Sequence, residues 1–407
     1  GLPSGEYDVI LDAIFGIGLS REIAGEFADA VNWINEQDAL RFAVDIPSGV
    51  NATTGEILAV AAAADFTITF GTNKRGIVLF PGCNYAGTVI VSDIGFPKKA
   101  VEEIRPRAYT LTRQDAMELM PPRILRSNKG SYGKVLVIAG SAEISGACYL
   151  CAAAAGRMGS GLVKVFTAAE NSTVIRTRLP EALVATYDST LDYSQPENRL
   201  ELSGRLQEEI KWASCIVIGP GIGTKEPAGI LLTEVLKEKN KAIVIDADGL
   251  NVLSGKDEYF VEREDGTRKL ALSANVVLTP HLQEMSRLTR FELPLIRARI
   301  VDQALLALEC ANGQTLVLKD ARTVVTDGGE VYINTTGNNA LSTGGTGDVL
   351  TGMIAGLLAQ GMRPKRAAVL AVCLHGIAAD EYVRDRGGRY SMIASDLLDM
   401  LPQILPK

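Results

Sequence analysis

The residue types best suited to chemistry lie together in the run Gly344-Gly345-Thr346-Gly347-Asp348, directly before an apolar stretch that is expected to be helical. Glycines let a ligand approach the backbone closely, and a helix N-terminus offers unpaired N–H groups and the positive end of its dipole. Both features favour phosphate. A carboxylate there would be repelled by the ligand, unless it takes a proton from the group that attacks the phosphate. The run therefore predicts phosphoryl transfer from a nucleotide, with Asp348 as the catalytic base.

A structural interpretation of the same run is also open. Asp is a favoured N-cap residue, so Asp348 could cap the helix while the glycines form an ordinary turn. Glycine-rich turns before helices are common, and a single motif is weak evidence. The two interpretations differ in what the Asp348 carboxylate contacts in the folded protein.

Polar and glycine-rich segments follow five of the strands that the sequence predicts in its second part. Ligands of open α/β sheets bind beyond the carboxyl ends of the strands, so we expect these segments to meet in one site. The segments are Gly140-Ser141, Gly219-Pro220-Gly221-Ile222-Gly223, Asp246-Ala247-Asp248, Thr279-Pro280-His281 and Lys319-Asp320.

Each segment also has a structural interpretation. The glycines could serve turns only, Asp248 could cap the next helix, and Lys319 could lie along the surface with its ammonium in water. The two histidines differ in their surroundings. His281 follows a strand and is a candidate ligand contact, whereas His375 lies in an apolar helix and is expected to be structural.

Strand-like and helical segments alternate along the chain, which is typical of βαβ units and a largely parallel sheet. In the first part, strands are predicted at Asp8–Ile14, Arg41–Val44, Phe66–Phe70 and Gly87–Val91, with a helix near Phe27–Asn35. In the second part, they are predicted at Lys134–Ala139, Leu162–Phe166, Cys215–Ile218, Ala242–Ile245, Val276–Leu278 and Thr315–Leu318, and Thr323–Asp327 with Val331–Asn334 reads as a hairpin. Helices are predicted at Ala147–Arg157, Ala228–Glu238, Leu295–Glu309, Val349–Ala359 and Arg366–Val383.

The bulk properties are those of a globular protein with two domains. The 407 residues divide at a charged, proline-bearing passage, which predicts domains at residues 1–104 and 105–407. The net charge of −7 and the lack of a basic run argue against nucleic acid as a partner. No apolar run is long enough for a membrane helix and no signal peptide is visible, so we expect a cytoplasmic protein without a membrane partner. The cysteines are expected to be reduced and mostly buried: Cys83, Cys148, Cys151, Cys215, Cys310 and Cys373.

The first part also carries polar residues at strand ends. Asp12 and Asp45 each end a predicted strand, and Ser48 lies close to the second of them. Oxygen ligands of this kind could hold a cation or serve a proton-shuttling site. Gly16 and Gly18 form only half of a dinucleotide-binding fingerprint, which is weak evidence alone.

At this point the motifs resemble a known family. From about Arg107 to the C-terminus, the chain resembles the dehydratase domain of the bifunctional NAD(P)H-hydrate repair enzymes. Six motifs in order carry the resemblance: Asn128-Lys129-Gly130-x-Tyr132-Gly133, Gly219–Gly223, Asp246–Asn251, Leu278–His281, Lys319, and Gly337-Asn338 through Thr351. The first part resembles the C-terminal portion of the family's epimerase domain, through Asp12–Gly18, Asp45–Gly49 and Ala86–Pro97.

The resemblance implies a fold and a reaction. The fold would be a ribokinase-like three-layer α/β/α domain with a mostly parallel sheet, preceded by part of a Rossmann-like α/β domain. The reaction would restore hydrated NADH or NADPH: ADP or ATP, with Mg²⁺, phosphorylates the added hydroxyl, and phosphate then leaves. By the same resemblance Ala147, Gly221, Gly223, His281 and Asp348 would contact the hydrate, while Lys319, Asp320, Ala321, Arg322, Thr323, Gly344, Gly345, Thr346 and Gly347 would hold the nucleotide.

In the epimerase-like part, the resemblance assigns Gly16, Gly18 and Asp45 to the substrate site, and Asp12 and Ser48 to a potassium ion. The sequence starts without Met, inside this domain, and lacks the half expected to complete it. A half-sheet exposes a raw edge. We therefore expect epimerase activity only if the missing half is supplied. The family also tends to form homo-oligomers, so a tetramer or larger assembly is expected.

The sequence departs from the family's usual motifs at two places, and one alternative function is open. Leu282-Gln283-Glu284 follows His281 where the family usually has Pro-Gly-Glu, and Asn128 stands where relatives often have His. A ribokinase-like kinase acting on a hydroxymethylpyrimidine, pyridoxal or a sugar is the alternative function, because it needs the same base and anion site. A nucleotide-binding scaffold without catalysis is disfavoured by Asp348, since a binder gains nothing from a carboxylate beside phosphate.

Overall fold

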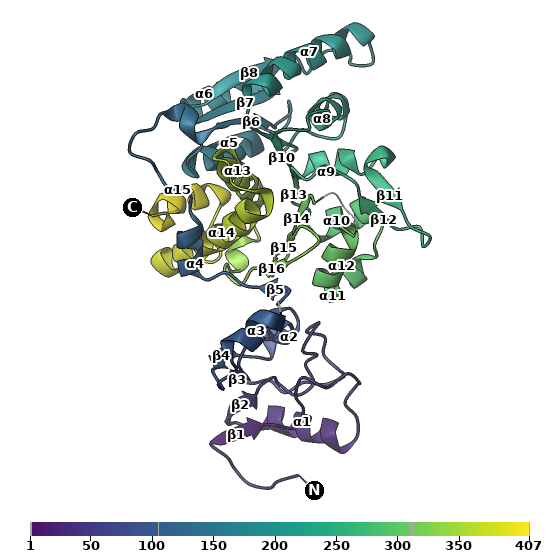
Figure 1. Ribbon diagram of the computed structural model, residues 1–407, viewed down its shortest axis with the longest axis vertical. Helices are drawn as coiled ribbons and strands as arrows, with labels where there is room; N and C mark the ends of the chain where they lie inside the picture. Colours follow the sequence, from purple (N-terminus) through teal and green to yellow (C-terminus); the bar gives the residue numbers. More distant parts are fainter. Residues whose placement is uncertain (1, 105, 310–312, 407) are drawn as a thin grey trace. The chain divides into compact units, whose positions relative to one another are not determined.

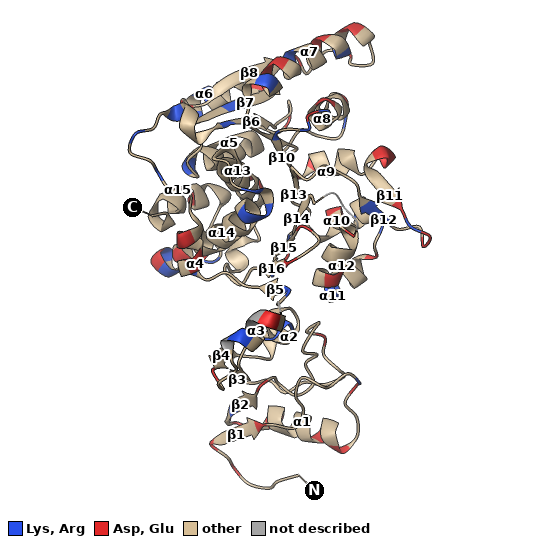
Figure 2. Ribbon diagram, in the orientation of Figure 1, with Lys and Arg blue, Asp and Glu red and all other residues tan. Residues whose placement is uncertain are grey.

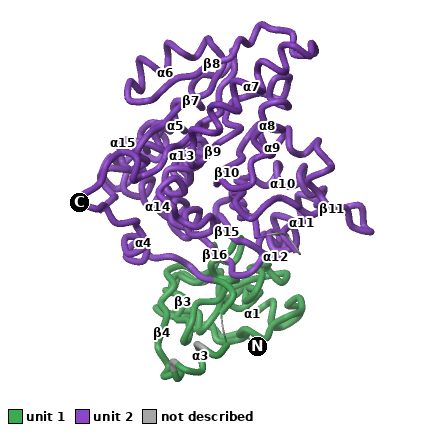
Figure 3. The backbone as a smooth tube through the Cα atoms, turned by 45° about the horizontal axis from the view of Figure 1, so that its top comes forward, with its two compact units in different colours: residues 1–108 green, residues 109–407 purple. Residues whose placement is uncertain are grey.

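The computed structural model describes residues 2–104, 106–309 and 313–406, which form two compact units of residues 1–108 and 109–407 (Figure 3). The domain boundary predicted after residue 104 lies close to this division. Cys310, one of the predicted thiols, lies outside the described residues. Cys148, Cys151, Cys215 and Cys373 are buried free thiols, as predicted, and Cys83 is a partly buried one.

Unit 1 is built on a four-stranded parallel sheet in the order β1-β2-β3-β4. Its elements are β1 (Val9–Asp12), α1 (Glu26–Glu36), β2 (Leu40–Val44), β3 (Phe66–Phe70), α2 (Arg75–Val78), β4 (Thr88–Ser92) and α3 (Lys98–Ile104). All four strands were predicted, and α1 buries Val31 and Ile34 against Ile10 of β1. On the face of β1 opposite to Ile10, Val9 is 50% and Leu11 67% exposed. The strand β1 lies at the end of this sheet and pairs with β2 alone among the described residues.

Unit 2 is built on a ten-stranded sheet in the order β5-β16-β15-β14-β13-β10-β9-β6-β7-β8. From β8 to β14 every neighbouring pair is parallel, whereas β14, β15 and β16 pair antiparallel. The strands are β5 (Ala108–Tyr109), β6 (Lys134–Ile138), β7 (Leu162–Ala168), β8 (Leu183–Tyr187), β9 (Cys215–Ile218), β10 (Ala242–Ile245), β13 (Val276–Leu278), β14 (Thr315–Leu318), β15 (Val324–Thr326) and β16 (Val331–Ile333). The predicted parallel sheet and its C-terminal hairpin are both confirmed.

Helices cover both faces of this sheet (Figure 1). One layer contains α4 (Arg113–Leu119), α5 (Gly146–Arg157), α13 (Thr346–Ala359), α14 (Pro364–Arg386) and α15 (Ala394–Ile404). The other contains α7 (Pro196–Trp212), α8 (Ala228–Leu236), α9 (Asp248–Leu253), α10 (Leu282–Thr289), α11 (Leu293–Ala298) and α12 (Ile300–Ala307). Acidic and basic residues alternate along exposed helices such as α7 (Figure 2). Among the described residues, no helix is both long and apolar enough to cross a membrane.

The structure corrects the sequence prediction in several elements. The helix predicted over Leu295–Glu309 is two helices, because Arg299 leaves the helical region at φ −132° and ψ 50°. Several elements were not predicted: the strands β5 and β8, the helices α4, α6 (Ser172–Arg178), α7, α9, α10 and α15, and a two-stranded ribbon of β11 (Phe260–Glu262) and β12 (Arg268–Leu270). These segments lack the long apolar runs that mark the central strands.

Close packing of α5 against α13 sets the position of the glycine-rich run. A Cβ on Gly352 would lie 2.1 Å from the Cys151 carbonyl oxygen, and one on Gly356 would lie 2.7 Å from that of Ala155. The two glycines therefore allow the helix backbones to touch. This contact holds α13, and with it the glycine-rich run at its start, over the central strands of the sheet.

We expect Gly352→Ala to lower the free energy of unfolding of unit 2 by about 1–3 kcal/mol, because the added methyl overpacks this interface. Gly204→Ala is the matched control, since Gly204 lies in α7 with nothing within 4 Å of the position of an added Cβ. That change should stabilise the protein by about 0.5–1 kcal/mol through helix propensity alone. Chemical denaturation measures both. Equal effects at the two positions would contradict the packing argument.

Candidate active site

The carboxyl ends of the central strands meet at one edge of the sheet, as predicted. The Gly140 amide donates to the Pro220 carbonyl at 2.8 Å, which joins the ends of β6 and β9. A Cβ on Gly219 would lie 1.8 Å from the Asp246 carbonyl oxygen, so only glycine fits where β9 and β10 end. The Lys319 amide donates to the Pro280 carbonyl at 2.8 Å, which joins the ends of β13 and β14.

A buried ion pair lies at the centre of this edge. The Asp246 carboxylate, at the end of β10, accepts from Lys319 Nζ at 2.9 Å and from Thr351 Oγ1 of α13 at 2.7 Å. Burial alone would raise the pKa of Asp246, yet the charge and hydrogen bonds of Lys319 and the Thr351 hydroxyl hold it below its usual value. Burial likewise opposes the charge on Lys319, but Asp246 and Glu284 raise its pKa. Both partners are therefore charged at neutral pH, and Lys319 is not the surface lysine of the structural interpretation.

The first turn of α13 presents amides without partners. Its N-cap is Gly345, at φ 90°, and no side chain caps the helix. No described residue accepts a hydrogen bond from the amides of Gly347 or Asp348. Lys319 Nζ lies beside them, 3.4 Å from where a Cβ on Gly347 would be. Unpaired N–H groups and an ammonium together form a site for an anion.

The Asp348 carboxylate does not cap the helix, so the structural interpretation of this residue is wrong. Asp348 is the third residue of α13, and no described residue donates a hydrogen bond to its carboxylate. Burial raises the pKa of Asp348 to about 7, the negative charges of Asp246 and Asp248 add to the effect, and Lys319 opposes it. A carboxylate with a pKa near neutrality, free of partners, is suited to accept a proton from a substrate.

Three of the predicted substrate residues of unit 2, Ala147, Gly221 and Gly223, lie at or against the glycine turn after β9. A Cβ on Gly221 would lie 3.1 Å from Ala147 Cβ, so the β9 turn packs on the start of α5. The Gly223 amide donates to Asp248 Oδ2 at 2.9 Å. Asp248 is thus the first residue of α9 and also anchors the glycine turn, rather than serving only as a helix cap.

His281 caps α10 by a reciprocal arrangement. Its Nδ1 accepts from the amides of Gln283 and Glu284, and the Glu284 carboxylate accepts from the His281 amide at 2.9 Å. Burial and the charge of Lys319 lower the pKa of His281, so the ring is neutral with its proton on Nε2. The side chain is still half exposed. Leu282 occupies the first helical position, where Pro is also favoured, so the departure from Pro-Gly leaves this turn intact.

The remaining predicted nucleotide residues lie in the turn after β14. Thr323 Oγ1 donates to the Asp320 carbonyl at 3.2 Å, and Arg322 donates to the Thr335 carbonyl at 3.3 Å. Asp320 and Ala321 are exposed. Lys319, which pairs with the buried Asp246, directly precedes this exposed turn in the chain. Gly344, at the start of the glycine-rich run, is exposed as well.

The structure brings two of the predicted residues of unit 1 into direct contact. The Asp12 carboxylate, only 2% exposed, accepts from Ser48 Oγ at 2.6 Å and from the Ser48 amide at 2.7 Å. Asp45 has φ 69°, a strained value for a residue with a side chain, and pairs with Lys74. Burial opposes the charge of Asp45, but Lys74 and the Phe70 amide lower its pKa. Gly16 and Gly18 are exposed in the loop after β1.

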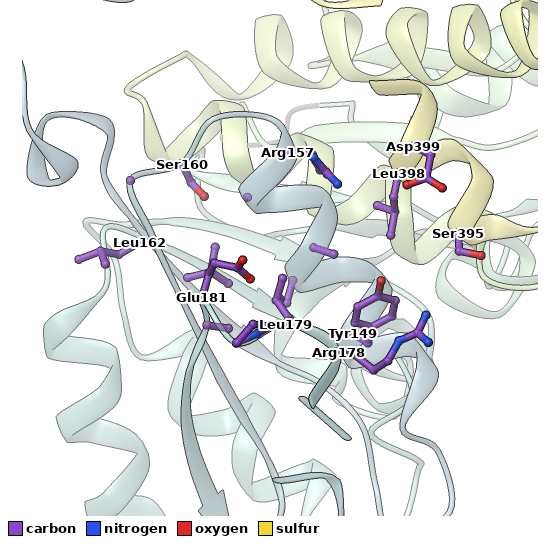
Figure 4. Close-up of a pocket in the computed structure, with 17 residues that line it drawn as sticks. Tyr149, Arg157, Ser160, Leu162, Arg178, Leu179, Glu181, Ser395, Leu398 and Asp399 are labelled. Carbon is purple, nitrogen blue, oxygen red and sulfur yellow. The ribbon is translucent and has the colours of Figure 1, made fainter. Parts of the chain in front are cut away.

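A cavity of about 640 Å³ lies elsewhere in unit 2, between α5, the start of β7 and α15. Figure 4 shows Arg157, Arg178, Glu181 and Asp399 around it. It contains none of the predicted site residues, and its four charged side chains are exposed. The buried charges and unpaired amides lie instead at the strand ends, which we therefore take as the candidate active site.

Several residues that the structure brings to the two sites were not predicted from the sequence. Thr351 and Glu284 lay inside quoted motifs, but nothing in the sequence showed that they face Asp246 and Lys319. Lys74 gave no signal, because it is far from Asp45 in the sequence. His375 was predicted to be structural, and the structure places its ring against the Thr346 carbonyl at 3.0 Å.

The two aspartates should affect stability in opposite directions. The ionised form of Asp348 is disfavoured in the fold, so Asp348→Asn should raise the free energy of unfolding by about 1–3 kcal/mol at pH 8. The gain should fade as the pH falls through 7 and vanish below about 4, where both folded and unfolded chains are protonated. Asp246→Asn should lower it by about 3–5 kcal/mol at pH 8, because Lys319 loses its buried partner. Denaturant titration at several pH values measures this; a pH-independent gain for Asp348→Asn would contradict the raised pKa.

Comparison with known proteins matches both units. A family of NAD(P)H-hydrate dehydratases matches residues 135–403, and the family described as YjeF-related protein N-terminus matches residues 2–76. The bifunctional NAD(P)H-hydrate repair enzymes of Thermofilum pendens and Moorella thermoacetica are each 37% identical over 98% of this chain and 73% of their own.

Solved structures of similar proteins agree with the fold. A ribokinase-like superfamily protein of Enterococcus faecalis superposes with a TM-score of 0.61 at 28% identity, covering 73% of this chain and 94% of that one. The ADP/ATP-dependent NAD(P)H-hydrate dehydratase of Bacillus subtilis, crystallised with ATP and Mg²⁺, gives 0.58 at 29% identity, covering 72% and 96%. These matches confirm the resemblance and the ribokinase-like fold, and the chain belongs to the family of bifunctional NAD(P)H-hydrate repair enzymes.

Proposed function

We propose that unit 2 dehydrates hydrated NADH and NADPH in a reaction driven by ADP or ATP, and is therefore a hydro-lyase. The observation that carries the proposal is the pairing of a base with an anion site. Asp348, with a pKa of about 7, lies in the same turn as the unpaired amides of Gly347 and Asp348 and beside the ammonium of Lys319. Membership of the repair family favours this substrate over those of the small-molecule kinases.

In the first step, Asp348 takes the proton of the hydroxyl on the hydrated nicotinamide ring. The hydroxyl oxygen forms a bond to the terminal phosphorus of the nucleotide, and the bond to the leaving AMP or ADP breaks. The transferring phosphoryl group spreads charge over its oxygens, which the Gly347 and Asp348 amides and Lys319 would stabilise. Asp246 contributes by fixing Lys319 through the 2.9 Å ion pair.

In the second step, the carbon–oxygen bond of the phosphate ester breaks, and a proton passes from the neighbouring carbon to the departing phosphate. The electron pair of that C–H bond forms the ring double bond, so the products are the reduced nicotinamide cofactor and inorganic phosphate. Ala147, Gly221, Gly223 and His281 would hold the ring in this step. The neutral His281 carries a proton on Nε2, which lies 3.4 Å from Glu284 Oε1 and would donate to the substrate once it is bound.

The nucleotide would occupy the turn at Lys319–Thr323 and the run at Gly344–Gly347. No group of three or more His, Cys, Asp or Glu side chains suited to a metal ion occurs among the described residues. Mg²⁺ prefers to keep waters and to bind nucleotide phosphates, so its fit here is through the phosphates. Mg²⁺ would lower the charge repulsion between the phosphates and Asp348. A homo-oligomer of four or more chains and a cytoplasmic location stay predictions.

Asp348→Asn should lower kcat by about a hundredfold to ten-thousandfold, because the general base is lost. For the unsubstituted protein, kcat should fall as the pH falls below about 7, since Asp348 must be deprotonated to act. The assay mixes NADH hydrate, nucleotide and Mg²⁺ and follows the near-ultraviolet absorbance of the reduced nicotinamide.

Two outcomes of that assay would contradict the proposal. No absorbance rise with either ADP or ATP, together with a stable phosphate ester of another small molecule, would favour the kinase alternative. Near-normal turnover of Asp348→Asn would remove Asp348 as the base. Lys365→Ala is a matched control, because Lys365 pairs with Asp327 and Glu330 away from the site and should leave kcat unchanged.

For unit 1 we propose a potassium ion and an epimerase-type substrate site. The buried Asp12 carboxylate, the Ser48 hydroxyl and the Phe15 carbonyl converge, with Ser48 Oγ 2.6 Å from Asp12 Oδ1 and 3.4 Å from the Phe15 oxygen. An all-oxygen set with one carboxylate fits a hard monovalent cation. Asp12 and Ser48 would hold the ion, which would supply a positive charge next to Gly16, Gly18 and Asp45. Interconversion of the two hydrate epimers would need these residues together with the rest of the epimerase-type domain.

Potassium should stabilise unit 1 against heat relative to sodium at equal ionic strength. Saturation at 10–100 times the Kd would add about 1.4–2.7 kcal/mol to its free energy of unfolding. Ser48→Ala should remove the difference between the two salts, because it deletes one ligand and loosens Asp12. Differential scanning calorimetry in KCl and NaCl tests this. Equal unfolding temperatures in both salts for the unsubstituted protein would overturn the potassium site.

A further inference from the structure

One buried side chain that contacts the catalytic turn has no role in the mechanism above. His375 lies in the middle of α14 with 8% of its surface exposed, and its Nε2 is 3.0 Å from the carbonyl oxygen of Thr346. A carbonyl oxygen only accepts, so Nε2 carries a proton and donates. Burial lowers the pKa of His375 to about 4, so the ring is neutral and makes this bond with a single proton.

The contacted turn is one that needs support. Helix N-termini are commonly fixed by a side-chain cap that occupies the first amides. The first turn of α13 has no such cap, begins at a glycine with φ 90°, and contains a second glycine, Gly347. A side-chain cap would accept hydrogen bonds from the same amides that the transferring phosphoryl group requires. His375 instead holds the turn from its carbonyl side, which leaves the amides of Gly347 and Asp348 free.

The geometry of the peptide links this bond to the anion site. A trans peptide is planar, so the carbonyl of Thr346 and the N–H of Gly347 point in opposite directions. Fixing the carbonyl against His375 therefore fixes the direction of the Gly347 N–H. Asp348 follows in the same turn, so the direction of its carboxylate depends on the same support.

Other residues of α14 hold the chain that leads into this turn. The Thr336 hydroxyl donates to the Cys373 carbonyl at 2.9 Å, and Asp380 accepts from the Gly337 amide at 2.8 Å and from Asn338 Nδ2 at 2.9 Å. A Cβ on Gly376 would lie 2.2 Å from Thr336 Oγ1, so the loop lies directly on the helix. The helix α14 thus supports both the approach to the glycine-rich run and its end.

We infer that His375 is a positioning residue for phosphoryl transfer: it orients the Thr346–Gly347 peptide and the first turn of α13 so that two amides and the Asp348 carboxylate face the reacting groups. The inference rests on the proposed function of unit 2. It also explains why the Gly337-Asn338 motif accompanies the glycine-rich run, since both are held by one helix.

The test compares substitutions that keep or remove the donor. His375→Gln places an amide nitrogen near the position of Nε2, whereas His375→Met has a similar length without a donor and His375→Asn is too short to reach. We expect kcat to fall about tenfold to hundredfold in the Met and Asn variants, with KM for the nucleotide changed by less than about threefold. The loss is smaller than the roughly 10²–10³ that removal of an oxyanion donor costs, because the amides are misdirected but still present. The Gln variant should recover kcat to within about threefold of the unsubstituted protein.

Val369→Ala is the control for stability alone, because Val369 is buried in α14 but lies away from the turn. It should lower the unfolding temperature without changing kcat. A folded Met variant with normal kcat, or Met and Gln variants that are equally impaired, would overturn the role of His375. If the Met variant does not fold, the Asn variant is compared with the Gln variant in its place.

Hydrogen exchange separates this inference from the proposed function. The amides of Val349 and Leu350, which close the first turn, should exchange faster in the Met and Asn variants and at the normal rate in the Gln variant. That readout needs no substrate. If the unsubstituted protein does not dehydrate the hydrate, the proposed function fails, and unchanged exchange in all variants is then the result that overturns His375 as a positioning residue.

Discussion

The candidate active site depends on the buried ion pair between Asp246 and Lys319. Asp246 ends β10, Lys319 ends β14, and the Thr351 hydroxyl of α13 completes the group. Three elements that are far apart in the sequence therefore meet at one carboxylate. The pair is also the main local source of charge, since it places an ammonium beside Gly347 and a negative charge near Asp348. The pKa of Asp348 reflects the balance of burial and these two opposite charges.

The same region carries several features that cost stability. Asp348 is partly buried without a hydrogen-bond donor among the described residues, and the amides of Gly347 and Asp348 have no acceptor among them either. Ala247, between Asp246 and Asp248, has φ 48°, a value that side chains rarely adopt. Unpaired groups and strained backbone tend to occur where a ligand supplies the missing contacts. The tight glycine packing of α5 on α13 and the support from α14 offset these costs nearby.

Much of the fold and part of the site could be predicted from the sequence. The central strands of both units were predicted within a few residues, because buried parallel strands are continuous apolar runs. The residues at their carboxyl ends were predicted to meet for a topological reason, and they do. Sequence patterns did not predict elements that depend on tertiary contacts. The break at Arg299, the strand β8 and the ribbon of β11 and β12 carry no strong local signal. The pairing of Asp45 with Lys74 could not be predicted either, because it joins two loops of unit 1.

What the sequence determined by itself was the alternation of strands and helices, the order of the motifs and the glycines that permit close backbone contact. These follow from local patterns, namely apolar runs, turn residues and the freedom of glycine at positive φ. Only the tertiary structure decided the electrostatics of the site: that Asp348 is not a cap, that Lys319 is buried against Asp246, and that His375 supports the turn it faces. Charge interactions and desolvation depend on distances and burial between residues far apart in the chain, and one sequence does not contain those distances.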